Sequence, residues 1–177
     1  MKILLERLRL FIKVVPEEID NKEKIVKVVF NPLNINAKGE VKPNAFRVNT
    51  DDLSVNRLDY TTLNFCKRQG VQLEAKSKPA IKDKNFYGIA LLFAQEIRIL
   101  ANVVYKPIKK PIKHTNKAHA EIVVGFNKKI DAGQVSSAQY NLVTDELAKK
   151  ARLYTDKKEN LKVWESENAK DILNLRL

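Results

Sequence analysis

Residues 86–105 read FYGIALLFAQEIRILANVVY, and this stretch decides the fold. Its first eight residues, 86–93, form a compact apolar run of the length typical of a buried strand. Residues 94–101 carry charge and place two aliphatic side chains on one face of a short helix. Residues 102–105 include two adjacent valines and predict a second strand. The order of strand, short helix and strand indicates an α/β alternation.

Further strands are expected on both sides of this stretch. Residues 25–30 and 119–126 are β-branched runs, and each predicts a strand. Residues 3–15 fit both a helical face and a strand alternation, so their structure stays open at this point. Residues 31–45 contain turn-forming dipeptides and predict a loop.

One longer helix is expected between these strands. Residues 55–68 have a helical pattern of apolar side chains. Asp51, Asp52 and Ser54 precede it and are suited to cap a helix N-terminus. Gly70 is a residue type that commonly follows the last turn, so the helix is expected to end there.

The last quarter of the chain has a different pattern. Ser136 or Ser137 is suited to cap a helix that runs to about Tyr154. A second element follows, with apolar anchors at Leu161, Trp164, Ile172, Leu173 and Leu177. We therefore expect an α/β or α+β fold with a small mixed sheet and short helices. Residues 1–130 would form a basic body, and residues 131–177 a helical C-terminal extension.

Positive charge is concentrated in one part of the chain. The 177 residues include 33 Lys and Arg against 21 Asp and Glu, a net charge of +12. Residues 76–129 hold twelve of the basic residues and three of the acids, so a charge of +9 lies in less than a third of the chain. Pro107 and Pro111 favour an extended loop within it. An extended run of lysines suits a polyanion, because each ion pair releases a condensed counterion.

The residues expected to bind nucleic acid share this segment. They are Lys106, Lys109, Lys110, Lys113, Lys117, Tyr105, Lys128 and Lys129. Lysine dominates over arginine, so contacts with the backbone of RNA or DNA are expected rather than bidentate reading of bases. Tyr87 and Tyr105 can stack bases, whereas Phe86 is expected in the core. The alternative interpretation is a solvated lysine-rich loop without a ligand.

Composition and spacing argue against several classes of protein. The lone Cys66 allows no internal disulfide and is expected to pack inside a helix. Five isolated glycines provide no phosphate-binding loop. His114 and His119 are five residues apart and fall on different faces of a helix or strand, so neither a metal nor a cofactor is expected. Without a long apolar run or a signal-peptide pattern, we expect a cytoplasmic protein with no membrane partner.

His119 is the candidate for acid–base catalysis. A group that titrates near neutral pH beside phosphate-binding lysines is what a metal-free ribonuclease needs. The further candidate catalytic residues are Arg57, Ser54 and Glu96. In the alternative interpretation, His119 begins a strand and makes a structural hydrogen bond, and the sequence leaves open whether there is any catalysis.

Five short motifs occur in order between residues 41 and 126. They are Asn44-Ala45-Phe46-Arg47, Leu53-Ser54-Val55-Asn56-Arg57, Tyr87-Gly88-Ile89-Ala90, Ala94-Gln95-Glu96-Ile97-Arg98 and Ala118-His119-Ala120-Glu121-Ile122. This order resembles a group of small bacterial proteins with AF, LSV, glycine-hydrophobic and HA-x-I segments and no assigned activity. The resemblance implies a bacterial origin and a recurring set of Phe46, Ser54, Arg57, Glu96 and His119. It also implies a gene among mobile elements or antiviral defence loci.

Three functions are compatible with these features. The first is a nucleic-acid-associated binding module or accessory subunit that contacts phosphate backbones through residues 76–129. The second is a small metal-independent ribonuclease or nucleotide-processing enzyme that uses His119. The third is an interaction subunit that docks a protein partner through residues 136–177. The charge distribution favours the first of them.

Overall fold

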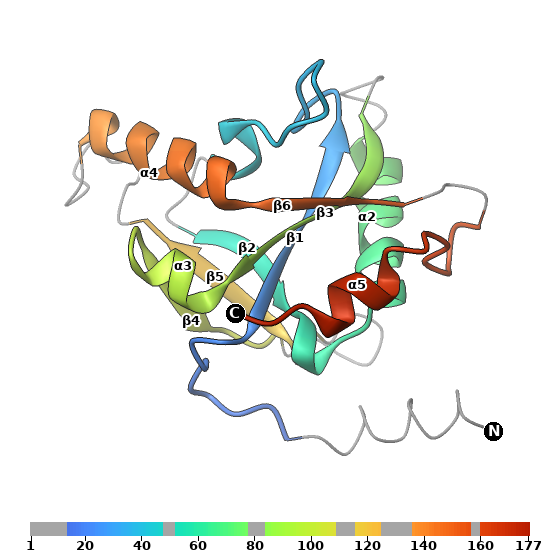
Figure 1. Ribbon diagram of the computed structural model, residues 1–177, viewed down its shortest axis with the longest axis horizontal. Coiled ribbons are helices and arrows are strands. Elements are labelled where there is room, and N and C mark those ends of the chain that lie inside the picture. The colour runs from blue at the N-terminus through green and yellow to red at the C-terminus, as the bar shows by residue number, and fades with distance from the viewer. Residues whose placement is uncertain (1–13, 48–51, 78–83, 109–115, 125–135, 157–159) are drawn as a thin grey trace.

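The computed structural model describes residues 14–47, 52–77, 84–108, 116–124, 136–156 and 160–177 (Figure 1). Six strands form one sheet in the order β4-β5-β2-β1-β3-β6, and every pairing between them is antiparallel. The strands are β1 (Lys24–Asn31), β2 (Asp52–Arg57), β3 (Asn85–Phe93), β4 (Asn102–Tyr105), β5 (His119–Val123) and β6 (Arg152–Thr155). The helices are η1 (Pro43–Ala45), η2 (Leu58–Tyr60), α2 (Leu63–Ser77), α3 (Ala94–Arg98), α4 (Ser137–Lys150) and α5 (Ala169–Asn174). The expected α+β class is confirmed, with an antiparallel sheet among the described strands.

Each face of the sheet carries its own hydrophobic core. The first core spans the whole width of one face and includes Val29, Val55, Ile122 and Leu92 beneath Leu147 of α4. The second core is narrower. It joins β1 and β3 to α2, to Trp164 and to α5 through residues that include Val26, Val28, Phe86, Ile89, Leu91, Cys66 and Ile172. Of the described strands, β2, β4 and β5 contribute no residue to this second core.

The strands expected around residues 86–105 form as predicted. The apolar run becomes β3, the short helix becomes α3, and the two valines lie in β4. Gly88 shows why β3 needs a glycine at its centre. The φ angle of Gly88 is 159°, and a Cβ atom there would lie 2.0 Å from the backbone carbonyl oxygen of Tyr154. The missing side chain therefore lets β6 approach β3 closely enough to pair.

The helix predicted at residues 55–68 is wrong in its first part. Leu53 and Val55 alternate with polar residues and point into the first core, as in a half-buried strand. β2 pairs with β5 from Asp52↔Val123 to Asn56↔His119, and the helix begins only at Leu63. Gly70 lies inside α2 instead of ending it. A glycine is needed there because an added Cβ atom would lie 2.2 Å from the Phe86 ring.

The C-terminal region is part of the body of the fold and not only a helical extension. Ser136 caps α4 as predicted, in a capping box with Gln139. The helix ends at Lys150, and β6 then joins the sheet beside β3, which Figure 1 shows. Buried Lys67 of α2 also reaches Asp156, with Nζ 2.5 Å from a carboxylate oxygen. Residues after 150 thus contribute a strand to the sheet and an ion pair to α2, and the expected boundary at residue 130 lies outside the described residues.

No helix in the described part of the chain has the length and apolar content needed to cross a membrane.

Candidate nucleic-acid interface

The second face of the sheet is polar over β2 and β5. Ser54, Asn56, His119 and Glu121 alternate with residues of the first core, so their side chains lie on the opposite face. Asn56 pairs with His119 and Ser54 pairs with Glu121 across the ladder, which brings each pair together on that face. We call these four residues the polar half-face. Three of them are buried, whereas Ser54 is exposed.

A chain of amide side chains crosses the polar half-face. Asn116 Nδ2 donates to Asn56 Oδ1 at 2.7 Å, and Asn56 Nδ2 donates to Gln69 Oε1 of α2, also at 2.7 Å. Asn116 Oδ1 in turn accepts from the backbone N–H of Ala118 at 3.1 Å. The amide chain therefore joins the base of the β4–β5 hairpin to β2 and then to α2, and it fixes these three elements relative to one another.

His119 begins β5, as one of the two interpretations of the sequence expected. Its Nδ1 lies 2.6 Å from the backbone carbonyl oxygen of Lys106. Because a carbonyl oxygen can only accept, Nδ1 is the donor, and Nε2 in the neutral ring is an acceptor. Nε2 is buried without a hydrogen-bond partner among the described residues, and His119 is only 4% exposed. The hydrogen bond to Lys106 ties the two sides of the hairpin together.

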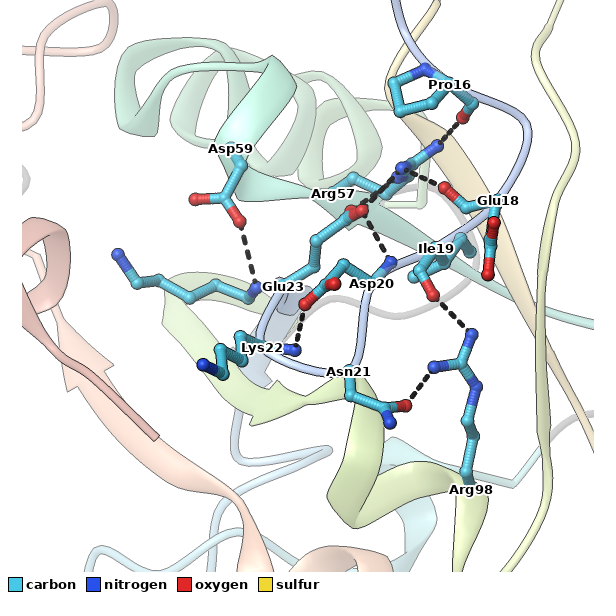
Figure 2. Close-up of polar contacts among 11 residues, drawn as sticks. Pro16, Glu18, Ile19, Asp20, Asn21, Lys22, Glu23, Arg57, Asp59 and Arg98 are labelled. Atoms are coloured by element: carbon cyan, nitrogen blue, oxygen red, sulfur yellow. Dashed lines mark hydrogen bonds and ion pairs between the residues drawn. The ribbon is translucent and has the colours of Figure 1, made fainter.

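Arg57 lies on the face of the sheet opposite His119, because it alternates with Asn56 along β2. Figure 2 shows its polar contacts. Its guanidinium is fully buried and forms a bidentate ion pair with Glu23, at 2.6 and 2.7 Å. It also donates to the backbone carbonyls of Pro16 and Glu18. The rings of Tyr60 and Tyr105 lie 4.6 and 5.1 Å from the guanidinium carbon. Arg57 therefore anchors the N-terminal segment on the sheet, and four of its five N–H groups are used within the fold.

Glu96 is also used within the fold. Its carboxylate accepts from the backbone N–H of Phe93 at 2.8 Å, which caps α3, and from both terminal nitrogens of Arg152 at 2.8 Å. Burial acts to raise the pKa of Glu96, but the hydrogen bonds from Arg152 and Phe93 outweigh it and lower the pKa. Of the four candidate catalytic residues, only His119 and Ser54 share a face of the sheet, and Arg57 and Glu96 are not brought to them.

Two of the predicted lysines lie at the base of the hairpin. Lys106 follows β4 and pairs with Glu121 at 2.6 Å, with 58% of its side chain exposed. Lys117 precedes β5 and is exposed. Ile108 and Asn116 pair across the hairpin just beyond them. Lys109, Lys110, Lys113, Lys128 and Lys129 lie outside the described residues.

The aromatic residues near these lysines are not exposed platforms. Tyr105 is half-buried, packs against the first core and lies beside the Arg57 guanidinium. Tyr87 is likewise half-buried against the first core, and Phe86 is buried in the second core. Tyr105 can stack on a base only if its ring moves away from the Arg57 guanidinium. The described aromatic residues therefore favour contacts with the phosphate backbone of a nucleic acid over base stacking.

An exposed stripe on α2 extends the basic surface and was missed by the sequence analysis. Arg68, Gln72 and Lys76 are all exposed, and their spacing of four places them on one side of the helix. Gln69, beside Arg68, is the end of the amide chain that comes from the hairpin. The spacing of these three residues is visible in the sequence, but it was missed because the predicted helix begins eight residues before the observed start of α2 at Leu63. We call Lys106, Lys117, Arg68, Gln72 and Lys76 the basic path.

A cavity of about 590 Å³ lies at the edge of the sheet beside β4. Its lining includes Glu17, Glu18, Arg98, Tyr105 and Pro107. Arg98 is held by the carbonyl of Ile19 and by the side chain of Asn21, as Figure 2 shows. Two exposed acids and a cation already bonded within the protein make this cavity a poor site for a polyanion.

The C-terminal region presents only part of the apolar surface that a docking function would use. Leu142 and Leu173 are exposed at 62% and 54%, whereas Leu147 and Trp164 are buried in the two cores. Leu161 and Leu177 are also exposed, and Ile172 is fully buried. Trp164 and Ile172 thus serve the packing of this chain on itself.

Two further observations concern metal ligands and the thiol of Cys66 in the described part of the chain. It contains no group of three or more His, Cys, Asp or Glu residues that could hold a metal ion. Burial raises the pKa of the Cys66 thiol to about 12, so Cys66 is a packing residue and not a thiolate nucleophile. Comparison of the chain with protein-family models, with curated proteins and with solved structures finds no match.

Proposed function

We propose that this protein binds the phosphate backbone of RNA or DNA along the basic path. The path begins at Lys106 and Lys117, at the base of the hairpin. It crosses the amide chain and continues along α2 through Arg68, Gln72 and Lys76. The hydrogen bonds from Asn116 to Asn56 and on to Gln69 support treating these residues as one surface, because they fix the hairpin against the helix.

The observation that carries the proposal is the position of the acids in the basic segment. Residues 76–129 contain three acids, of which Asp83 lies outside the described residues. Glu96 bonds Arg152 and Glu121 bonds Lys106, and their side chains are only 19% and 11% exposed. Neither carboxylate is presented to a polyanion. Glu96 and Glu121 therefore do not offset the positive charge of the exposed Lys76 and Lys117.

The dimensions of α2 suit a nucleic-acid strand. Arg68 and Lys76 are eight residues apart, which corresponds to about 12 Å along a helix axis. Phosphates of one strand are spaced at about 3.4 Å along a duplex axis, so the stripe spans roughly three or four of them. Lysine point charges and a glutamine amide contact phosphate oxygens without reading bases, and binding is therefore expected to be weakly sequence-specific.

Fluorescence anisotropy with 20-nucleotide RNA and DNA, single-stranded and duplex, tests the proposal at two or more salt concentrations. The test variants are Arg68→Glu/Lys76→Glu on α2 and Lys106→Glu/Lys117→Glu at the hairpin. The matched control is Lys22→Glu/Lys150→Glu, which reverses two exposed lysines away from the basic path. Each test variant should weaken binding at least tenfold and reduce the salt slope by about one to two, whereas the control should stay within about threefold.

Two results would contradict the proposal. One is the absence of salt-dependent binding by the unmodified protein at low salt. The other is an equal loss of affinity in the control and the two test variants. That result would mean that binding depends on the net charge of the protein and not on a defined surface. If only the hairpin variant loses affinity, the nucleic acid does not reach α2.

A further inference from the structure

The ion pair between Lys67 and Asp156 lies where charged groups are costly. Lys67 is 1% exposed, and on the same side of α2 Leu63 belongs to the second core and Val71 packs against it. The side chain of Asp156 is fully buried, and one of its oxygens lies 2.5 Å from Lys67 Nζ. Removing two charges from water costs free energy that their attraction repays only with good geometry and further hydrogen bonds. Transfer of one proton within the pair removes both charges and leaves an amine beside a carboxylic acid.

The two carboxylate oxygens of Asp156 have different surroundings. Oδ1 accepts a hydrogen bond from the backbone N–H of Glu165 at 2.9 Å. Oδ2 is the oxygen that faces Lys67, and it is buried without a hydrogen-bond partner in the described part of the chain. Lys67 Nζ therefore approaches Oδ2 closely but without the alignment of a hydrogen bond. The Glu165 N–H favours Oδ1 as the carbonyl oxygen, and Oδ2 is the oxygen that can receive the proton.

A second carboxylate lies within reach of the same amine. Glu165 Oε2 is 3.5 Å from Lys67 Nζ and accepts from the backbone N–H of Asn160 at 2.7 Å. Nζ also donates to the backbone carbonyl of Val163 at 2.6 Å, and Figure 1 shows this segment beside α2. The side chain of Glu165 is 26% exposed, so a small molecule released at the site has a route to solvent. The cluster therefore combines an amine, a carboxyl group and a group able to move protons.

We propose that Lys67 and Asp156 form an amide bond with loss of one water, and that Glu165 transfers a proton in this reaction. One proton passes from the ammonium group to Oδ2. The Nζ lone pair then attacks Cγ of Asp156, while the Glu165 N–H stabilises the negative charge that develops on Oδ1. The Glu165 carboxylate takes a second proton from Nζ and passes it to Oδ2, and the Cγ–Oδ2 bond breaks. One ammonium and one carboxylate thus give one amide and one water, without an oxidant or reductant.

Two features of the fold favour this bond. The folded chain holds Nζ against the carboxyl group, so the reaction is intramolecular and its entropy cost is met by folding. Exclusion of water from the pair favours the uncharged reactants and protects the amide from hydrolysis. The bond would link α2 to the end of β6, more than eighty residues later, and would restrict the unfolded chain in the manner of a disulfide. It does not depend on nucleic-acid binding.

Intact-mass spectrometry of the unmodified, denatured protein tests the proposal, both after purification and after incubation at neutral pH. The mass should be lower than that of the free chain by one water, about 18 Da. A tryptic digest should contain a branched peptide that joins Lys67 to Asp156. The internal control is Lys106 and Glu121, which lie 2.6 Å apart but with the lysine 58% exposed, and no branched peptide should join them. The full mass of the free chain in both samples would overturn the proposal, and so would a loss of water that maps elsewhere.

Substitutions separate the roles of the three side chains. Lys67→Arg should abolish the loss of water, because a guanidinium does not form the amide. Glu165→Gln should slow formation of the bond at least tenfold, whereas Glu146→Gln, in an exposed ion pair with Lys149, should leave the rate unchanged. A Glu165→Gln protein that forms the bond as fast as the unmodified protein would remove Glu165 from the reaction. The intact mass and the branched peptide come from the unmodified protein, so they decide the matter even if a variant fails to fold.

Discussion

The second face of the sheet has two halves that are built in different ways. Over β1 and β3, Val26, Phe86 and Leu91 pack beneath α2 and α5 in an apolar core. Over β2 and β5, the same face carries Asn56 and His119, which are as deeply buried but polar. Apolar burial stabilises a fold without directional preference, whereas hydrogen-bonded amides hold specific elements in one arrangement. The apolar half therefore supplies stability, and the polar half positions the hairpin and α2.

The largest effect is expected in the apolar half. Phe86→Ala removes a fully buried ring that packs against Gly70 of α2 and leaves a cavity. The free energy of unfolding should fall by about 3–5 kcal/mol, as measured by urea denaturation. Leu73→Ala on the same helix is the control. Because Leu73 is 38% exposed, this substitution should lower the free energy of unfolding by well under half as much. Similar losses for the two variants would show that α2 does not close the second core in this way.

A smaller effect is expected in the polar half. Asn56→Ala removes two hydrogen bonds and leaves the buried Asn116 amide and Gln69 Oε1 without their partners. The free energy of unfolding should fall by about 2–3 kcal/mol. In a double-mutant cycle, the variant with both Asn56→Ala and Asn116→Ala should lose less than the sum of the two single losses. Strictly additive losses in the cycle would contradict the coupled amide chain.

The smallest effect is expected at His119. His119→Leu removes the hydrogen bond to the Lys106 carbonyl but also removes the unpartnered Nε2, and these changes oppose one another. The free energy of unfolding should change by no more than about 1 kcal/mol. Nucleic-acid affinity should change less than threefold, because Nε2 is buried. A loss of affinity above tenfold with unchanged stability would instead place His119 in contact with the ligand.

The elements recovered from the sequence are those with a strong local pattern. Residues 86–93, 25–30 and 102–105 could be predicted as strands because each is a short run rich in apolar, β-branched or aromatic residues. The N-terminal cap at Ser136 could also be predicted from the sequence, because a capping box depends on residues that are only three positions apart.

Two strands were not predicted from the sequence, because their stability comes from partners that are distant in the chain. β2 has only Leu53 and Val55 as its apolar alternation, and its conformation depends on pairing with β5, more than sixty residues later. β6 has four residues and forms because β3 lies beside it and Gly88 leaves room. Local propensity is weak in such short segments, so tertiary pairing decides.

The candidate site divides in the same way. Lys106 and Lys117 could be identified from charge alone, since acid-free runs of lysine are visible in any chain. Arg68 and Lys76 could not, because their common face appears only once the helix is placed correctly at Leu63–Ser77. Arg57 was a candidate catalytic residue, but the fold buries it against Glu23, and no local pattern of sequence shows that a guanidinium will be bonded in this way.

The sequence by itself determined the α+β class, the positions of the strongest strands and the excess of positive charge in residues 76–129. These properties follow from composition and from periodicities of two and 3.6 residues, which act over short distances. Only the tertiary structure decided which polar residues meet. Asn56, Gln69 and Asn116 become one hydrogen-bonded chain, because the order of strands and the packing of α2 bring them together across long separations in the chain.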